Sequence, residues 1–138
     1  MNDKGFTLIE LIATILILAL VMSIATYSIT NVIKRSKEEN YNILINNIKD
    51  GAEVYYQECK YANNSGISCS LSNGSYVITL GDLVKYNYLK GNDADNQYVI
   101  VNPKNDEDIG SCQVKVSYSN GTILVEAVSP SGSCPTSY

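Results

Sequence analysis

Few side chains in this chain of 138 residues are able to carry chemistry, and it has no histidine. All four cysteines lie in its polar part: Cys59, Cys69, Cys112 and Cys134. An even number of cysteines in a small domain behind an apolar N-terminus predicts disulfides outside the cytoplasm. Zinc is the rival interpretation, but no C-x-x-C pair occurs and no histidine can complete a site. A serine hydrolase would also lack its base, so no catalytic set is visible and we predict that the chain is not an enzyme.

A single charged residue, Glu10, interrupts an apolar run over residues 6–33. Residues 11–29 carry no charge, and no Pro or Gly lies between Phe6 and Asp50, so the pattern predicts one uninterrupted helix. At about 1.5 Å per residue the uncharged stretch measures about 28 Å, close to the hydrocarbon thickness of a bilayer. A carboxylate at the middle of such a helix costs about 2.5–3.5 kcal/mol. Glu10 therefore needs a partner.

A secretory signal peptide is the alternative interpretation of this run. Met1–Lys4 would be its charged start, and Ser23–Ala25 would supply a small-residue cleavage site. The apolar run is longer than the core of about 7–15 residues that signal peptides have, and a signal peptide has no use for a charge at Glu10. The sequence therefore favours a helix that can span a membrane.

The motif GFTLIE at residues 5–10, followed by an apolar helix, resembles the processing motif of type IV prepilins and pseudopilins. The resemblance implies that a prepilin peptidase cuts between Gly5 and Phe6 on the cytoplasmic side and methylates the new amino group of Phe6. It also implies that Glu10 pairs with the Phe6 ammonium of a neighbouring subunit. Many family members carry Pro where this chain has Tyr27, so a kink of the helix at that point is not expected here.

On this resemblance the chain is a structural subunit of a type IV pilus or pseudopilus. The partners that it implies are further copies in a helical filament, prepilin peptidase, and the pilus assembly platform with its ATPase machinery. The precursor would lie in the bacterial inner or cytoplasmic membrane with its head outside, and the filament would be extracellular. Lys34, Arg35 and Lys37 after the helix, against Lys4 before it, favour the opposite orientation, whereas the family and the cysteines favour an outside head.

Other functions within and outside this class stay open. The chain could be a minor or tip pilin, a competence pseudopilin in DNA uptake, or a membrane-anchored extracellular binding module that does not polymerise. Residues 38–138 carry 6 basic and 12 acidic residues, a net charge of −6. This acidic balance argues against direct nucleic-acid binding by the chain.

We expect three parts: a leader peptide at 1–5, a transmembrane or filament-core helix at 6–33, and a globular head at 34–138. The head includes the second half of the long helix, because apolar residues spaced by three or four continue on one face: Leu44, Ile48, Ala52, Tyr55 and Cys59. Gly51 in this segment is predicted to be a weak point of the helix. Residues 60–75 are predicted to form a loop, being rich in Asn, Ser and Gly.

The rest of the head is predicted as a short helix and a small antiparallel sheet, giving an α+β, pilin-like fold. Asp82 is expected to cap the short helix, with three core residues after it: Leu83, Val84 and Leu89. Tyr98–Val101 is predicted to be a strand. Asn120-Gly121 separates two β-like runs and predicts a hairpin whose paired positions sum to 241. That register puts Val114 and Val116 on the apolar face and Lys115 opposite Glu126.

Four cysteines allow three pairings. We favour Cys59–Cys69 with Cys112–Cys134, because the first bond closes a short loop and the second resembles the C-terminal disulfide-bounded region of many type IV pilins. The two crossed pairings stay open. Oxygen-rich stretches at 92–96 and 105–108 could bind calcium, but they lack EF-hand spacing and are better interpreted as solvated turns. No metal or cofactor is expected.

Overall fold

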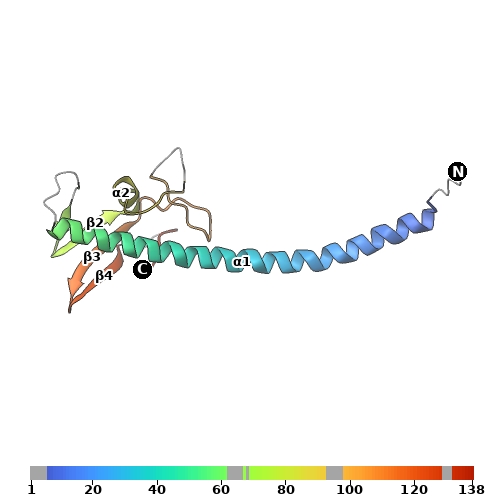
Figure 1. Cartoon of the computed structure of the whole chain (residues 1–138), viewed down its shortest axis with the longest axis horizontal. Helices are drawn as coiled ribbons and strands as arrows, with labels where there is room; N and C mark the ends of the chain where they lie inside the picture. Colours follow the sequence, from blue (N-terminus) through green and yellow to red (C-terminus); the bar gives the residue numbers. More distant parts are fainter. Residues whose placement is uncertain (1–5, 62–66, 68, 93–97, 129–131) are drawn as a thin grey trace. The chain divides into compact units, whose positions relative to one another are not determined.

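The computed structural model describes residues 6–61, 67, 69–92, 98–128 and 132–138, with the backbone alone at 25–28, 70 and 72. This part of the chain contains, in order, α1 (Leu8–Tyr61), β1 (Ser70–Ser72), β2 (Ser75–Thr79), α2 (Leu80–Lys85), β3 (Gln113–Ser119) and β4 (Thr122–Val128) (Figure 1). The chain divides into two compact units, Met1–Lys37 and Glu38–Tyr138. A long helix with a small antiparallel sheet confirms the predicted α+β, pilin-like layout.

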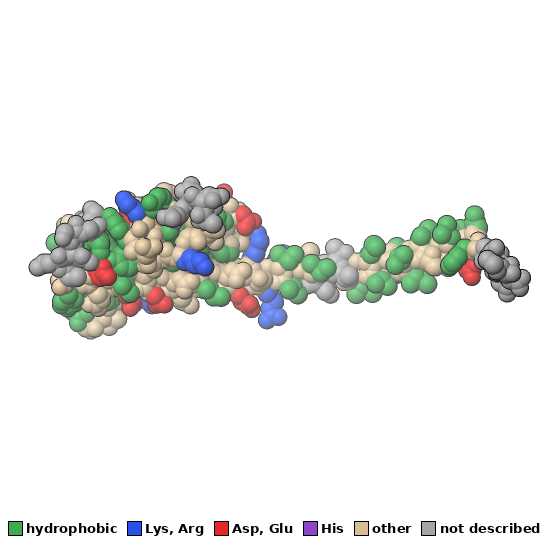
Figure 2. All heavy atoms as spheres, turned by 45° about the horizontal axis from the view of Figure 1, so that its top comes forward, with side chains coloured by type: hydrophobic (Ala, Val, Ile, Leu, Met, Phe, Trp, Pro, Cys, Tyr) green, Lys and Arg blue, Asp and Glu red, His purple; other side chains and the backbone are tan. Residues whose placement is uncertain are grey.

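Helix α1 is continuous over 54 residues, or about 81 Å. Within α1 no Pro or Gly precedes Gly51, and the backbone stays helical through Tyr27, where a kink is not expected. In Figure 2 most of the coloured side chains along the first half of α1 are hydrophobic, with backbone visible between them. Among the described residues, α1 is the helix that is long and apolar enough to cross a membrane, and none of its most apolar stretch is buried.

The second half of α1 gives the head its core, as the spacing of apolar residues predicts. Ile48, Ala52 and Tyr55 are completely buried, while Leu44 and Cys59 are partly buried at the two ends of the same face. Side chains from α1, α2 and the sheet meet here in one cluster. The largest fully buried side chains in it are Tyr55, Ile48, Leu80, Leu83, Ile100, Ile109, Val114 and Val116.

Gly51 is not a weak point of α1 but a point of close contact, which corrects the prediction made for it. Gly51 is buried, and a Cβ at this position would lie 2.6 Å from the Tyr88 carbonyl oxygen. A backbone carbonyl cannot move aside as easily as the end of a flexible side chain. Glycine, which has no Cβ, therefore allows α1 to pack this close to the backbone of Tyr88. The packing of the head therefore requires glycine at a position where helix propensity alone disfavours it.

The variant Gly51→Ala is expected to destabilise the head by up to about 2 kcal/mol. Overpacking costs about 1–3 kcal/mol, and alanine recovers about 1 kcal/mol of helix propensity. Urea denaturation followed by tyrosine circular dichroism measures the difference. Asn46→Ala, on an exposed position of the same helix, is the matched control and should be neutral or slightly stabilising. A Gly51→Ala protein as stable as that control would contradict the close-contact explanation.

The sheet has the strand order β1-β2-β3-β4, with every neighbouring pair antiparallel. The predicted β3–β4 hairpin is confirmed in register as well as in position. Val114 pairs with Ala127 and Val116 with Val125, and both valines of β3 are fully buried. On the opposite face the Lys115 ammonium lies 3.0 Å from the Glu126 carboxylate.

A second hairpin, β1–β2, replaces the end of the loop predicted for residues 60–75. Its turn is Asn73-Gly74, and both residues have positive φ, 50° and 77°. These values match the two-residue turn that Asn-Gly favours. The same dipeptide that identifies the β3–β4 turn was thus present here. β1 has only three residues, and two of them are serines. The segment before this turn therefore lacks the apolar run that indicates a strand.

The predicted strand Tyr98–Val101 is wrong. This segment makes a single isolated bridge, between Val101 and Asp108. Ile100 is nonetheless fully buried in the core, and its backbone N–H donates to the Asp108 carboxylate at 3.3 Å. Side-chain oxygens of Asp108 and Asn92 accept from the Ile100 and Val101 N–H groups, while loop backbone N–H groups donate to the Val99 and Ile100 carbonyls. Loop partners therefore satisfy backbone that a neighbouring strand would otherwise satisfy.

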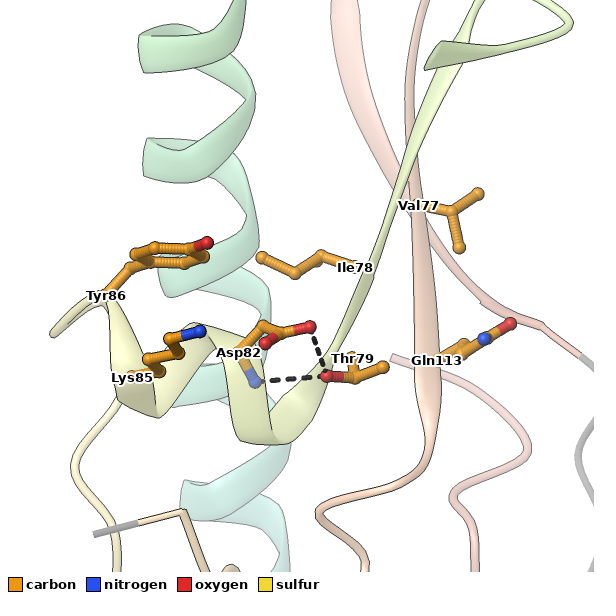
Figure 3. Close-up of a pocket in the computed structure, with 7 residues that line it drawn as sticks. All are labelled: Val77, Ile78, Thr79, Asp82, Lys85, Tyr86 and Gln113. Carbon is orange, nitrogen blue, oxygen red and sulfur yellow. Dashed lines mark hydrogen bonds between the residues drawn. The ribbon is translucent and has the colours of Figure 1, made fainter. Parts of the chain in front are cut away.

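Helix α2 begins with a capping box in which Thr79, not Asp82, is the N-cap. The Thr79 hydroxyl oxygen accepts from the Asp82 backbone N–H at 3.0 Å, and the same hydroxyl donates to the Asp82 carboxylate at 2.7 Å (Figure 3). Asp82 is the third helical residue, so the predicted cap lay three residues too late. The predicted core positions Leu83, Val84 and Leu89 are confirmed as buried.

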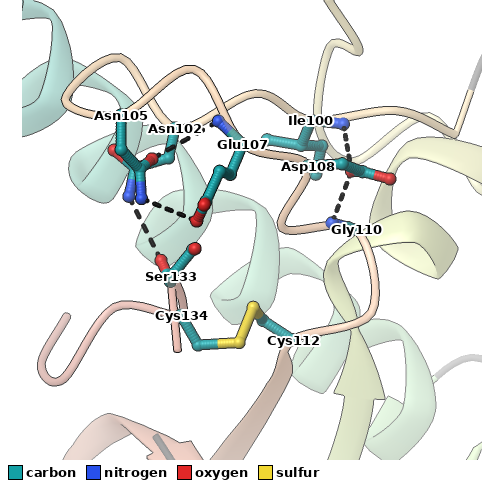
Figure 4. The surroundings of a disulfide bond; sticks show 9 residues. All are labelled: Ile100, Asn102, Asn105, Glu107, Asp108, Gly110, Cys112, Ser133 and Cys134. Atoms are coloured by element: carbon teal, nitrogen blue, oxygen red, sulfur yellow. Dashed lines mark hydrogen bonds between the residues drawn. A yellow bond between two sulfur atoms is a disulfide. The ribbon is translucent and has the colours of Figure 1, made fainter. Parts of the chain in front are cut away.

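Two disulfides close loops in the head, Cys59–Cys69 directly before β1 and Cys112–Cys134 directly before β3. Their Cα atoms lie 5.8 and 5.6 Å apart, within the usual range for such bonds. Beside the second disulfide, the buried Asn102 donates from its amide nitrogen to the Ser133 carbonyl at 3.1 Å (Figure 4). The last described residues are thus joined to the rest of the head by one covalent bond and one buried hydrogen bond.

The raised pKa values of two tyrosines predict that the head becomes less stable at alkaline pH. The Tyr88 hydroxyl donates to the Glu58 carboxylate, and burial together with this bond raises the pKa of Tyr88. Burial also raises the pKa of Tyr138 to about 12. An unfolded tyrosine ionises near pH 10, so the stability from both groups is present below about pH 10 and is lost as pH rises through the folded pKa values. Unfolding free energies of wild type and Tyr88→Phe, measured between neutral pH and about pH 11, should show a shallower fall for the variant; equal slopes would contradict the assignment.

Candidate processing and assembly site

The start of α1 is built as a capping box around Thr7 and Glu10. Thr7 immediately precedes the first helical residue, and Glu10 is the third helical residue. The Glu10 Oε2 atom accepts from the Thr7 backbone N–H at 3.0 Å and from the Thr7 hydroxyl at 2.9 Å. In return, the Glu10 backbone N–H lies 3.4 Å from the Thr7 hydroxyl oxygen. This reciprocal arrangement satisfies donors that a helix N-terminus leaves without partners.

Thr7 is a functional residue that the sequence analysis missed, although its signal was present. The pattern Thr-x-x-Glu at the start of an apolar helix is the sequence signature of a capping box. The charge of Glu10 alone predicts a partner from another chain and gives no indication of the cap. The structure gives it a partner within the same chain, and it gives the helix a defined first residue.

Phe6 and the apolar side chains that follow it are exposed. The exposed fraction is 80% for Phe6, 78% for Leu8 and 70% for Ile9. A helix that is apolar on every side needs lipid or other helices around it. The predicted cleavage position lies at the edge of the described part of the chain: Phe6 is within it, and the leader with Gly5 is outside the described residues.

Comparison with known protein families bears on this segment. Residues 1–26 match the family described as the prokaryotic N-terminal methylation motif. This match supports the resemblance of the N-terminal segment to type IV prepilins. The prepilin-type match covers this segment and does not extend to the head. No curated protein and no solved structure matches the chain.

The prepilin-type motif and the long apolar helix together support a pilin-like or pseudopilin-like precursor anchored in a membrane. The motif also implies processing by prepilin peptidase and a connection to pilus assembly. The proteins that carry this motif are structural, which agrees with the prediction of a non-enzymatic role without testing it.

The two oxygen-rich stretches contribute no cation site among the described residues. Positions 93–96 of the first stretch lie outside them. In the second, the Asp108 Oδ1 atom accepts from the Gly110 backbone N–H at 2.9 Å, and Asn105 donates to Glu107 at 2.9 Å. These contacts are turn-forming, as Figure 4 shows. Within the described part of the chain, no three His, Cys, Asp or Glu residues are grouped so as to hold a metal ion.

A pocket beside α2 is one of the concave features that charged side chains line. Its lining residues are Val77, Ile78, Thr79, Asp82, Lys85, Tyr86 and Gln113 (Figure 3). The Asp82 carboxylate in it already accepts from Thr79, and the Lys85 ammonium lies 5.6 Å from the centre of the Tyr86 ring. Both charged groups therefore serve the local structure of α2.

Proposed function

We propose that this chain is a structural subunit of a type IV pilus or pseudopilus filament. In this proposal prepilin peptidase cuts it between Gly5 and Phe6, methylates Phe6, and assembly proceeds through the first half of α1. The observation that carries the proposal is a helix with exposed apolar side chains on all sides and one carboxylate in its first turn. Lipid covers such a helix in the precursor, and helices of other copies replace the lipid in the filament.

The geometry of Glu10 supports its proposed role in assembly. Both Thr7 bonds to the carboxylate end on Oε2, so among the described contacts Oε1 is left for a donor from another chain. The proposed donor is the methylated ammonium of Phe6 in a neighbouring subunit. Neither Thr7 nor Glu10 belongs to the leader, so the capping box survives the proposed cleavage and holds the carboxylate in place.

Electrostatics explain why the partner should come from another copy. The new amino group of Phe6 would lie one residue before the N-cap, where the helix dipole is positive and disfavours a cation. Two unlike charges buried between staggered helices neutralise one another and set the axial register. If the two charges paired within one helix, both would face lipid, and the pair would not fix the axial position of a neighbouring subunit.

Mass spectrometry of the membrane-bound and sheared fractions tests the proposal. The expected mature protein lacks residues 1–5 and carries one added methyl group on Phe6. It should be recovered in sheared filaments as well as in the membrane. An intact Met1, or a start at Thr26, would overturn the processing step. Correct processing with no polymer in the sheared fraction would instead indicate a membrane-anchored binding module that does not polymerise.

A further inference from the structure

A cluster of cations follows the apolar part of α1 within one helical turn. Lys34 and Arg35 come directly after Ile33, and Lys37 lies two positions after Arg35. Lys34 and Arg35 are exposed, as are Val32 and Ile33 before them, at 65% and 51%. The change from exposed apolar to exposed cationic side chains is therefore abrupt and occurs on an uninterrupted helix.

The length of the helix between its charges fits a bilayer from edge to edge. Lys34 lies 24 positions after Glu10, a rise of about 36 Å, whereas the hydrocarbon core is about 30 Å thick. When Lys34 lies at one edge of the hydrocarbon, Glu10 therefore reaches the opposite edge, with modest tilt of the helix. In the unassembled precursor Glu10 need not lie at the middle of the bilayer, and Lys34 and Arg35 lie among lipid headgroups.

We propose that Lys34 and Arg35, with Lys37 beside them, bind the phosphate groups of anionic lipids and so set the depth of α1 in the membrane before assembly. Arginine presents a planar fork that matches phosphate, and lysine supplies a point charge on a long stem. Each cation near an anionic membrane surface contributes an enrichment of about five-fold. The proposal rests on the membrane anchoring of the precursor and not on filament formation.

Lipid fits this cluster better than the acidic head of a second copy does. The cations directly adjoin the exposed apolar side chains, so lipid that covers Val32 and Ile33 brings its headgroups to them. The acidic groups of the head are in part already paired: Lys104 lies 3.8 Å from Glu38 and Lys115 lies 3.0 Å from Glu126. Glu38 and Glu126 are therefore already neutralised by lysines of their own head.

Energy transfer from a single tryptophan to labelled lipids tests the proposal. The chain has no tryptophan, so Val32→Trp provides one reporter at the end of the apolar segment. The full chain with this substitution is reconstituted in vesicles of equal parts phosphatidylcholine and phosphatidylglycerol. Transfer to pyrene-labelled phosphatidylglycerol should exceed transfer to pyrene-labelled phosphatidylcholine several-fold. The ratio of the two transfer efficiencies should fall toward one in about 1 M salt, where charges more than about 3 Å apart are screened.

Variants of the Val32→Trp protein that lack selected charges test whether Lys34 and Arg35 cause the lipid preference. Lys34→Gln/Arg35→Gln should abolish the preference, whereas Lys49→Gln/Lys90→Gln, which removes two exposed lysines of the head, should preserve it. Equal transfer to both lipids in the parent protein would overturn the proposal. So would chemical cross-links between copies that depend on Lys34 and Arg35 without any lipid preference. Absence of transfer to either lipid would show that the helix is not inserted, and would overturn the membrane anchor itself.

Discussion

Glu10→Gln is expected to insert into the membrane at least as well as wild type but to yield at least ten-fold fewer filaments. Glutamine can still accept from Thr7, so the start of α1 should be unchanged. It cannot neutralise the Phe6 ammonium of a neighbouring subunit. Removing one partner of a buried ion pair costs about 3–5 kcal/mol because the other charge is left uncompensated. The ratio of sheared filament to membrane-bound subunit, measured by immunoblot, gives the effect.

Two control variants make this result specific. Glu39→Gln makes the same chemical change at an exposed position of α1 and should assemble normally. Thr7→Val keeps the carboxylate but removes the hydroxyl from the capping box, and loss of a cap costs about 1 kcal/mol. It should therefore reduce assembly less than Glu10→Gln does. Wild-type filament yield from Glu10→Gln would refute the pairing role.

Replacement of both Cys112 and Cys134 by serine is expected to be the most destabilising change in the head. The bond closes a loop of 22 residues, for which the chain-entropy relation gives about 3.4 kcal/mol. Its loss also releases the segment that the Asn102–Ser133 hydrogen bond attaches at 3.1 Å. The melting temperature should fall by about 15 °C. Thermal unfolding in detergent, followed by circular dichroism, measures the shift.

The other disulfide provides an internal comparison. Cys59–Cys69 spans 10 residues, so the same relation gives about 2.7 kcal/mol. Cys112 is 4% exposed within the core, whereas Cys69 is exposed. Serine at both Cys59 and Cys69 should therefore lower the melting temperature less. An equal or larger loss from that pair would contradict the importance assigned to the second disulfide.

Local patterns in the sequence predicted those parts of the fold that local interactions decide. The spacing of Ile48, Ala52 and Tyr55 identified the buried face of α1, because helical periodicity depends on neighbours three and four positions away. The Asn120-Gly121 turn defined the β3–β4 register, since a two-residue turn leaves one way to pair the strands. Both results need no knowledge of the rest of the chain.

The wrong predictions concern residues whose role depends on distant parts of the chain. Gly51 is required because the backbone of Tyr88 approaches α1, and no pattern near position 51 reveals that approach. Tyr98–Val101 has strand-forming residues, but Asp108 satisfies its backbone instead of a neighbouring strand. The Thr79 cap is different, because its signal is local: a threonine three residues before an aspartate is itself a pattern typical of a helix N-terminus.

The sequence by itself determined the features of the N-terminal segment: an apolar run long enough to cross a membrane, one carboxylate within it, and a match to the N-terminal methylation motif. Those properties follow from hydropathy and from the order of residues along the chain, and no tertiary contact is needed for them. The tertiary structure decided how the head is held together. It joined Cys59 to Cys69 and Cys112 to Cys134, and it made glycine obligatory at position 51. Pairing and close packing depend on distances between residues far apart in the chain, and only the folded backbone sets those distances.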